Sequence, residues 1–234
     1  MCWTGPTTGT CASPPAGATT YGYDANGKRT SGGADTYTYD ATGMMTSATT
    51  PTGASSYTYA PDGLRTSKTV GATSTVFSWD DTTPVPQLIQ DGNNYSIYGP
   101  DGLPVERLGT DPTQWLPCDA TGSVIGSTDA TGSLTSVQTY TPWGTVIEHT
   151  GNPVSLGWQA QYQDPETHLY YLQHRYCDPT TDQFATPDCQ ATVLHAPPFP
   201  TRGSSIQAAP FLYCAVPDVV PVCKVSKLNG QCTL

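Results

Sequence analysis

Aromatic and polar residues alternate along the first half of the chain in a short unit that recurs about every twenty residues. The unit reads Tyr-x-Tyr-Asp-x-x-Gly at 21–27 and 37–43, and related copies lie at 57–63, 77–80, 98–102 and 118–122. Its anchor positions 23, 39, 59, 79, 98 and 118 are 16, 20, 20, 19 and 20 residues apart. A period in this range predicts a repeat architecture, because each unit can bury its apolar face only against its neighbours.

The end of each unit carries the signals of a tight turn. Four segments begin with Asp and end with Gly: Asp24–Gly27, Asp40–Gly43, Asp119–Gly122 and Asp129–Gly132. Aspartate in this position accepts hydrogen bonds from the turn backbone, and glycine takes the left-handed position that follows. Three variants at 60–63, 99–102 and 141–144 place Pro second, where its fixed φ suits the same turn. We therefore expect β-hairpins, with a different turn after Phe77, whose unit lacks the glycine.

The two aromatic residues of a unit are two positions apart, so they share one face of a strand. Neighbouring hairpins would then stack their rings into ladders, each pair contributing about 0.5–1.5 kcal/mol beyond simple burial. The main interpretation of these tyrosines is core packing. The alternative is that exposed aromatic rows bind carbohydrate.

Composition and charge narrow the range of functions. Only 36% of the residues are hydrophobic and 12% are charged, but 14 Tyr and 5 Trp supply the apolar surface that disordered chains lack. The net charge is −10: residues 1–190 hold 6 basic and 18 acidic side chains, which give −12, and residues 191–234 give +2. Such a body repels phosphate backbones, so we expect no nucleic-acid partner. We also expect no membrane span, because prolines interrupt the most apolar run, and the N-terminus lacks signal-peptide features.

Eight cysteines are present, five of them between Cys177 and Cys232. No Cys-x-x-Cys pair and no histidine at zinc-finger spacing accompanies them, so we expect no metal and no cofactor. Disulfides in an oxidising compartment and free or partly paired thiols both remain open, and the spacing does not select a pairing.

A longer motif after the repeats carries a family resemblance. Residues 157–179 contain Gln161-Tyr162, then Asp164-Pro-Glu-Thr-His-Leu-Tyr-Tyr171, then Arg175-Tyr-Cys-Asp-Pro179. Together with the Tyr-x-Tyr-Asp units, this progression resembles the YD repeats and associated core of the RHS (rearrangement hot spot) proteins, including polymorphic toxins and the C components of Tc toxins. The resemblance covers residues 20–190.

The resemblance implies a hollow β-shell wound from a spiral of hairpins, which encloses a variable C-terminal polypeptide and is closed by the core. In several members the core is an aspartyl autoprotease that releases this cargo. The positions similar to that machinery are Arg175, Asp178 and Asp188. Two carboxylates can share a proton, so that one activates water and the other protonates the leaving amide, while an arginine holds one of them ionised.

The chain also departs from the family pattern near these positions. Cys189 replaces the proline expected after Asp188, and the glycine near the cleavage point is absent. Cys177 replaces a common tyrosine, and His168 replaces a glycine that is expected to adopt a positive φ, which would strain the backbone. These departures favour a core that does not cleave itself, in which Asp178 and Asp188 are turn carboxylates.

We therefore predict an all-β fold: a YD-repeat β-hairpin spiral, or partial RHS shell, with a short irregular C-terminal tail. The expected organisation is an irregular lead (1–19), YD-repeat hairpins (20–150), the RHS-associated core (151–190) and a variable, Pro- and Cys-containing tail (191–234) that is irregular or disordered. The predicted function is a structural shell and core-plug segment of a secreted or cell-surface protein, with autoproteolysis and glycan binding as alternatives. Its expected partners are the rest of the shell or the C-terminal cargo. Alone, the chain is expected to self-associate through open sheet edges.

Overall fold

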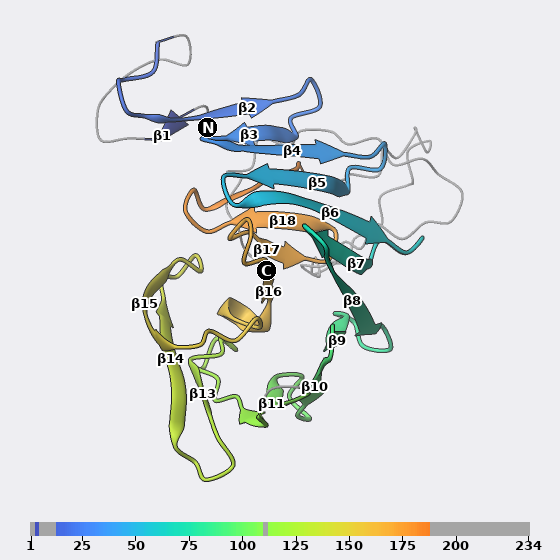
Figure 1. Ribbon diagram of the computed structural model, residues 1–234, viewed down its shortest axis with the longest axis vertical. Coiled ribbons are helices and arrows are strands. Elements are labelled where there is room, and N and C mark those ends of the chain that lie inside the picture. The colour runs from blue at the N-terminus through green and yellow to red at the C-terminus, as the bar shows by residue number, and fades with distance from the viewer. Residues whose placement is uncertain (1–2, 5–12, 110–111, 188–234) are drawn as a thin grey trace, which may run out of the picture.

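The structure is a computed structural model that describes residues 3–4, 13–109 and 112–187, whose regular elements are β-strands and one short 3-10 helix. The first sheet, which we call the wall, runs in strict chain order from β1 to β15, and every described neighbouring pair is antiparallel (Figure 1). A second sheet contains β16 to β19. This order of consecutive hairpins confirms the all-β hairpin spiral that the repeat predicts.

The wall strands are β1 (Trp3–Thr4), β2 (Thr19–Tyr23), β3 (Arg29–Gly32), β4 (Asp35–Tyr39), β5 (Met45–Thr50), β6 (Gly53–Tyr59), β7 (Arg65–Val70), β8 (Thr73–Asp80), β9 (Gln87–Asp91), β10 (Asn94–Tyr98), β11 (Pro104–Leu108), β12 (Gln114–Trp115), β13 (Gly126–Thr128), β14 (Leu134–Tyr140) and β15 (Val146–Gly151). Residues 152–187, which we call the core segment, hold the 3-10 helix η1 (Trp158–Ala160) and β16 (Tyr162–Gln163), β17 (Tyr170–Leu172), β18 (Arg175–Asp178) and β19 (Gln183–Phe184).

The turns have the geometry that the Asp and Gly positions predict. In the first of them the N–H of Gly27 donates to the carbonyl of Asp24 at 3.0 Å, and Gly27 has φ +81°. The Asp24 carboxylate accepts from the N–H groups of Asn26 and Lys28, each at 2.9 Å. The different turn expected after Phe77 is also present: residues 81–86 form a longer loop between β8 and β9.

In five units the aromatic residue that precedes the turn ties one hairpin to the hairpin before it. Its polar hydrogen donates to a backbone carbonyl in the preceding strands, at 2.6–3.0 Å. The five described donor and acceptor pairs are Tyr39 to Arg29, Tyr59 to Met45, Trp79 to Arg65, Tyr98 to Leu88, and Tyr140 to Val124. These five bonds help to keep the hairpins that they join in register.

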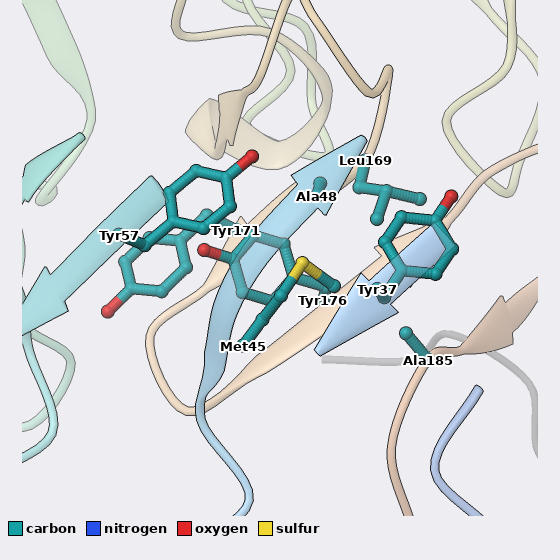
Figure 2. Close-up of a cluster of buried hydrophobic side chains, with 8 residues drawn as sticks. All are labelled: Tyr37, Met45, Ala48, Tyr57, Leu169, Tyr171, Tyr176 and Ala185. Carbon is teal, nitrogen blue, oxygen red and sulfur yellow. The ribbon is translucent and has the colours of Figure 1, made fainter. Parts of the chain in front are cut away.

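The first aromatic residue of the second and third units packs inward. Tyr37 and Tyr57 are 5% and 4% exposed, and they meet Tyr171 and Tyr176 of the core segment in one cluster (Figure 2). A second cluster joins the wall residue Phe77 to residues 154–162 of the core segment. Core packing of the tyrosines is therefore confirmed for these units, and their rings do not form an exposed row.

The outer surface changes along the wall. From β4 to β8, directly paired residues form a row of hydroxyl side chains across five strands: Thr38, Ser47, Ser56, Thr69 and Ser74. Residues 87–151 instead expose ten large apolar side chains within the described part: Ile89, Tyr95, Ile97, Val105, Leu108, Trp115, Ile125, Leu134, Val137 and Ile147. The same hairpin unit thus presents two different outer surfaces.

The backbone at His168 and at the N-terminal lead can be compared with what the sequence predicts. His168 has φ +60°, so the positive φ expected where it replaces a glycine is confirmed. The lead at 1–19 is not wholly irregular, because Trp3 and Thr4 pair with Thr20 and Thr19 in an antiparallel ladder. The expected tail at 191–234 lies outside the described residues.

Candidate functional site

The inner face of the wall holds cations that bind carboxylates of the core segment. Asp164 is fully buried and accepts from Arg65 Nη1 at 2.6 Å and from Lys68 Nζ at 3.0 Å. Lys68 also contacts Glu166 at 3.0 Å, and the Tyr57 hydroxyl donates to Glu166 at 3.2 Å. Arg65 and Lys68 lie three apart on β7, yet both converge on the Asp-Pro-Glu turn. This cluster fastens that turn to the wall.

The guanidinium of Arg65 lies in a cage of aromatic rings. Its central carbon is 4.4 Å from the ring centroids of Phe77 and Tyr171 and 5.2 Å from that of Tyr162. Nε and Nη2 have no hydrogen-bond acceptor among the described residues. The ring faces therefore take the place of acceptors for part of the cation.

Burial and pairing act in opposite directions on these cations. Burial lowers the pKa of Arg65, but Asp164 reverses this effect and holds the pKa well above its ordinary value. Burial also lowers the pKa of Lys68, and the charges of Asp164, Tyr162 and Glu166 outweigh it, so that this pKa is raised as well. Both side chains therefore stay charged in the interior, where removing one partner would leave an uncompensated ion.

A second cluster surrounds Asp178, one of the residues predicted for catalysis. Arg29 Nη1 pairs with Oδ2 of Asp178, and Thr181 donates to the same oxygen at 2.9 Å. Oδ1 accepts from the N–H of Thr180 at 2.9 Å and from the Thr180 hydroxyl. Arg29 Nη2 also reaches Thr181 at 3.0 Å. Oδ2 thus holds the core segment to β3, and Oδ1 fixes the turn that follows β18.

These contacts set the charge of Asp178. Burial raises its pKa, but the Thr180 hydrogen bond and the Arg29 guanidinium outweigh burial and hold the pKa below its ordinary value. Asp178 is therefore an ionised carboxylate at neutral pH. Its environment suits a fixed anion, and in a proton-sharing pair it could serve only as the member that lacks the proton.

The other two predicted catalytic residues are placed differently. Arg175 and Asp178 are both on β18, three positions apart, so their side chains leave opposite faces of the strand. The Arg175 guanidinium lies over the Phe184 ring, 3.7 Å from its centroid. Asp188 lies outside the described residues. The structure therefore brings Asp178 to Arg29, and the catalytic set remains a prediction.

A third cluster contains an ion pair within the wall. Asp91 on β9 accepts from Arg107 on β11 at 2.8 Å, and Ser155 of the core segment bridges them through contacts of 2.7 Å to Arg107 and 3.1 Å to Asp91. Burial raises the pKa of Asp91, and Arg107 opposes this only in part. Here the core segment contributes a hydroxyl group and no charge.

Two turn glycines allow the core segment to approach the wall closely. A Cβ on Gly63 would lie 2.5 Å from Nδ1 of His174, and a Cβ on Gly144 would lie 2.9 Å from the Trp158 ring. Both glycines have positive φ, +85° and +89°. At these positions glycine serves the turn and the wall–core contact together.

Sequence reasoning missed Arg29 and Arg65, the cations that hold the core segment. Each lies two residues after a turn glycine, at a position that Met45 fills with an apolar side chain in the intervening unit. The three side chains are each about 1% exposed or less. The signal that could have revealed these cations is the alternation of arginine with methionine at one inward position of the repeat.

The described residues show few other functional features. They contain no group of three or more acidic, His or Cys side chains arranged to hold a metal ion. No helix in this part of the chain has the length and apolar character needed to cross a membrane. Among the cysteines, Cys177 is disulfide-bonded and Cys118 is a free thiol.

Comparisons with known proteins agree with this architecture. Residues 103–199 match the family model of the Teneurin YD-shell. The crystal structure of TcdB2-TccC3 is similar with a TM-score of 0.56 and 15% identity over 74% of this chain and 10% of that one. The TcdB2-TccC3-Cdc42 structure gives 0.56 and 13%, with 78% and 11% covered. No match to a curated protein was found.

A third solved structure, the Tc holotoxin pore of Photorhabdus luminescens, is similar with a TM-score of 0.51 and 15% identity over 71% of this chain and 9% of that one. The chain spans about a tenth of the length of the chains that it matches. At these identities the likeness shows the fold.

Proposed function

We propose that this chain is an RHS/YD-repeat protein of the Tc-toxin type and that it forms a wall-and-core segment of a larger secreted shell, as its hairpin fold and its similarity to the YD-shell family model support. Such a shell would enclose or present a variable C-terminal polypeptide. In this role the chain acts as a structural element, and its partners are further YD-repeat hairpins and the polypeptide that they surround.

The observation that carries this proposal is the joint between wall and core segment. Buried Arg65 and Lys68 bind Asp164, and buried Arg29 binds Asp178. Each of the carboxylates Asp164, Glu166 and Asp178 is paired with a wall cation, so these groups fix one layer to the other. Substrate chemistry would require at least one group that is free to react.

The wall also supports the proposal at its end. β15 is the last strand of the wall and pairs with β14 alone among the described strands. Its other side presents unpaired backbone groups, which are the natural place for a further hairpin to add. In isolation this edge is available to a second copy of the chain.

The test is the association state of the isolated chain. Light scattering after size exclusion should show oligomers for the wild type and a smaller species for His149→Pro, because proline in β15 removes an N–H and obstructs strand addition. His149→Ala is the matched control and should behave as wild type. A monodisperse wild-type monomer at high concentration would contradict the proposal for this edge.

Autoproteolysis is the second candidate. It is supported by Asp178, a buried and ionised carboxylate close to the end of the described core segment. In this mechanism Asp178 would activate water, and Asp188 would supply the proton to the leaving amide. The hydrogen bonds on both Asp178 oxygens argue against it, because one of them must be exchanged for the water.

Intact-mass analysis distinguishes the two roles of Asp178. If the core cleaves itself, wild type is shortened and Asp178→Asn keeps its full length. Glu166→Gln, which weakens a wall–core contact outside the predicted catalytic set, is the matched control and should still be cut. We expect full-length mass for all three proteins, as a purely structural segment requires.

A further inference from the structure

A groove lies between the wall and the core segment, and none of the ion-paired side chains lines it. It encloses about 410 Å³, and an adjoining depression of about 370 Å³ shares Tyr98 and Pro100 with it. The loop after β8 and the turn after β10 form one side, and residues around η1 form the other. The concave surface is therefore elongated, which suits an extended chain.

Aromatic rings form the apolar part of this groove. Trp79, Tyr98 and Tyr162 all line it. The indole N–H of Trp79 and the hydroxyl of Tyr98 donate to the backbone carbonyls of Arg65 and Leu88, which fixes the orientation of both rings. Grooves lined by fixed aromatic rings suit proline-rich segments, because a polyproline II helix is already extended and loses little conformational entropy on binding.

Carboxamides supply the polar part. Gln159, Gln161 and Gln173 line the groove from the core segment. The side-chain oxygen of Gln159 is buried and has no hydrogen-bond partner among the described residues. Such an atom costs free energy unless a ligand or water satisfies it. A peptide can do so with a backbone N–H, and its carbonyls, which a polyproline II helix leaves unpaired, can accept from glutamine amides.

The charge of the groove is negative. Asp101, which is exposed, is the one charged side chain among the lining residues, and Asp80 is the one charged side chain in the adjoining depression. A phosphate or carboxylate group would therefore meet anions and no cation. The groove favours a ligand that carries a positive charge.

A segment with these properties is present in the sequence of this chain. Residues 197–202 read Pro-Pro-Phe-Pro-Thr-Arg, with prolines at 197 and 200 and an arginine two positions later. A polyproline II helix has three residues per turn, so the Pro-x-x-Pro spacing places both prolines on one face. The segment lies outside the described residues. Its sequence complements the rings and the carboxylates of the groove.

The described chain ends close enough to the groove for this segment to reach it. Ala185 and Trp79 belong to the same group of packed side chains. The N–H of Ala185 donates to the carbonyl of Tyr176 at 2.8 Å. The Tyr171 ring lies 5.3 Å from that of Tyr176 and 5.6 Å from that of Trp79. The ten residues 188–197 span up to about 33 Å when extended, which is longer than this path.

We propose that this groove binds the Pro-x-x-Pro segment 197–202 of the same chain. Pro197 and Pro200 would pack on the rings of Trp79 and Tyr98, and Arg202 would pair with Asp101. The proposal goes beyond the shell function and does not depend on it, because the contact forms within one chain. The C-terminal region would then be held at the wall by a non-covalent, reversible contact.

Titration of a labelled peptide against the full chain tests the proposal. The peptide spans residues 195–204, and the acceptor protein carries Pro197→Ala and Pro200→Ala, so that its own segment no longer fills the groove. Fluorescence anisotropy should show binding to this acceptor at least about tenfold tighter than to wild type, whose linked segment competes at a high effective concentration. Equal affinity for the two proteins, or no binding to the folded acceptor, would overturn the proposal.

Hydrogen exchange separates binding within one chain from binding between two copies. The N–H groups of residues 101–103 should exchange more slowly in wild type than in the acceptor protein, at about 1 µM and at about 50 µM protein alike. Protection that develops only at the higher concentration would assign the segment to the groove of a second copy and refute the intramolecular contact.

Substitutions test the pairing of Arg202 with Asp101. In the acceptor protein, Asp101→Asn should weaken peptide binding about two- to fivefold, as loss of an exposed ion pair does. Asp62→Asn is the matched control and should have no effect, because Asp62 holds the same position of a Pro-Asp-Gly turn outside the groove.

The peptide variant Arg202→Gln completes a double-mutant cycle. It should weaken binding as much as Asp101→Asn does, and it should cause no further loss on the Asp101→Asn protein. Near-ultraviolet circular dichroism checks that each protein variant is folded. Full additivity of the two losses, or an equal effect of Asp62→Asn, would refute the assignment of the segment to this groove.

Discussion

The strands β3 to β7 and the strands β9 to β11 hold the core segment by different means, although both derive from one hairpin unit. In β3 to β7, wall cations bind carboxylates of the core segment, so charge crosses the interface. In β9 to β11, Asp91 and Arg107 neutralise each other within the wall, and the core segment adds Ser155. Apolar contacts around Phe77 and Leu156 supply the rest.

This difference shows that the repeat specifies a hairpin without specifying its inward chemistry. The inward position after the turn glycine holds Arg29, Met45, Arg65, Pro104 and Val124 in successive units. Where it holds arginine, the core segment is fixed by ions that cannot be left unpaired. Where it holds proline or valine, the layers are joined by apolar packing and by hydrogen bonds such as that from the N–H of Val124 to the carbonyl of Gly157.

The largest expected effect on stability comes from breaking the ion pairs between the wall and the core segment. Asp164→Leu leaves both Arg65 and Lys68 without their buried anion, which should cost about 3–5 kcal/mol of unfolding free energy. Amide hydrogen exchange should then show loss of protection in β16 to β18. Asp91→Leu should loosen β9 and β11 and leave protection of β16 to β18 nearly unchanged. Equal loss in the core sheet for both variants would remove the distinction between the two regions.

Substitution of two glycines with nearly the same φ tests the close packing of the core segment on the wall. Gly144→Ala and Gly132→Ala both place a methyl group at a left-handed position, at a cost of about 1–2 kcal/mol. A Cβ on Gly132 meets no atom within 4 Å, whereas one on Gly144 meets Trp158 at 2.9 Å. Overpacking should add about 1–3 kcal/mol for Gly144→Ala alone. Urea denaturation of the two variants measures the difference, which would be near zero if the close contact did not matter.

Lowering the pH should change the contributions of Asp178 and Asp91 to stability in opposite directions. The pKa of Asp178 is lowered in the fold, so its contribution to stability is complete above about pH 4 and is lost as the pH falls through the folded value. The pKa of Asp91 is raised, mainly by burial, so its contribution is present in acid and declines as the pH rises through the folded value.

Unfolding free energies from about pH 3 to pH 7 give the check. The deficit of Asp178→Asn relative to wild type should shrink in acid. Asp91→Asn should gain relative to wild type as the pH rises. Parallel pH profiles for the two variants would show that the two pairs respond alike.

The smallest effect on stability is expected at the outer surface. Leu134→Ser and Trp115→Ser change exposed side chains and should shift the unfolding free energy by about 0.5 kcal/mol or less. They should nevertheless reduce self-association, because they divide an exposed apolar surface. Thr58→Val, on the hydroxyl-bearing outer face of β6, is the opposite change and should increase self-association. Analytical ultracentrifugation of the three variants measures both directions.

Features encoded within a few residues could be predicted from the sequence. The Asp and Gly positions predict the turns, the two-residue aromatic spacing predicts one buried face, and replacement of a glycine by His168 predicts a positive φ. Each depends on local sterics and hydrogen bonding, which neighbouring residues determine.

The partners of the core carboxylates could not be predicted in the same way. Arg29 and Asp178 are 149 residues apart, and Arg65 and Asp164 are 99 apart. Arginine within a polar strand usually faces solvent, so its sequence neighbourhood gives no sign of burial. Arg175 is near Asp178 in sequence, but its guanidinium lies over the Phe184 ring, whereas Asp178 pairs with Arg29.

The aromatic hydrogen bonds between hairpins also suit assembly of the wall in the order in which its hairpins are synthesised. Every donor belongs to a later unit and every acceptor carbonyl to an earlier one. As the chain leaves the ribosome, each new hairpin therefore meets an acceptor that is already in place. Asp164 and Asp178 are synthesised after β1 to β15. The cations of β3 and β7 therefore have no core carboxylate to bind until these strands have been made. Synthesis of the core segment is then the step that seals the assembled wall.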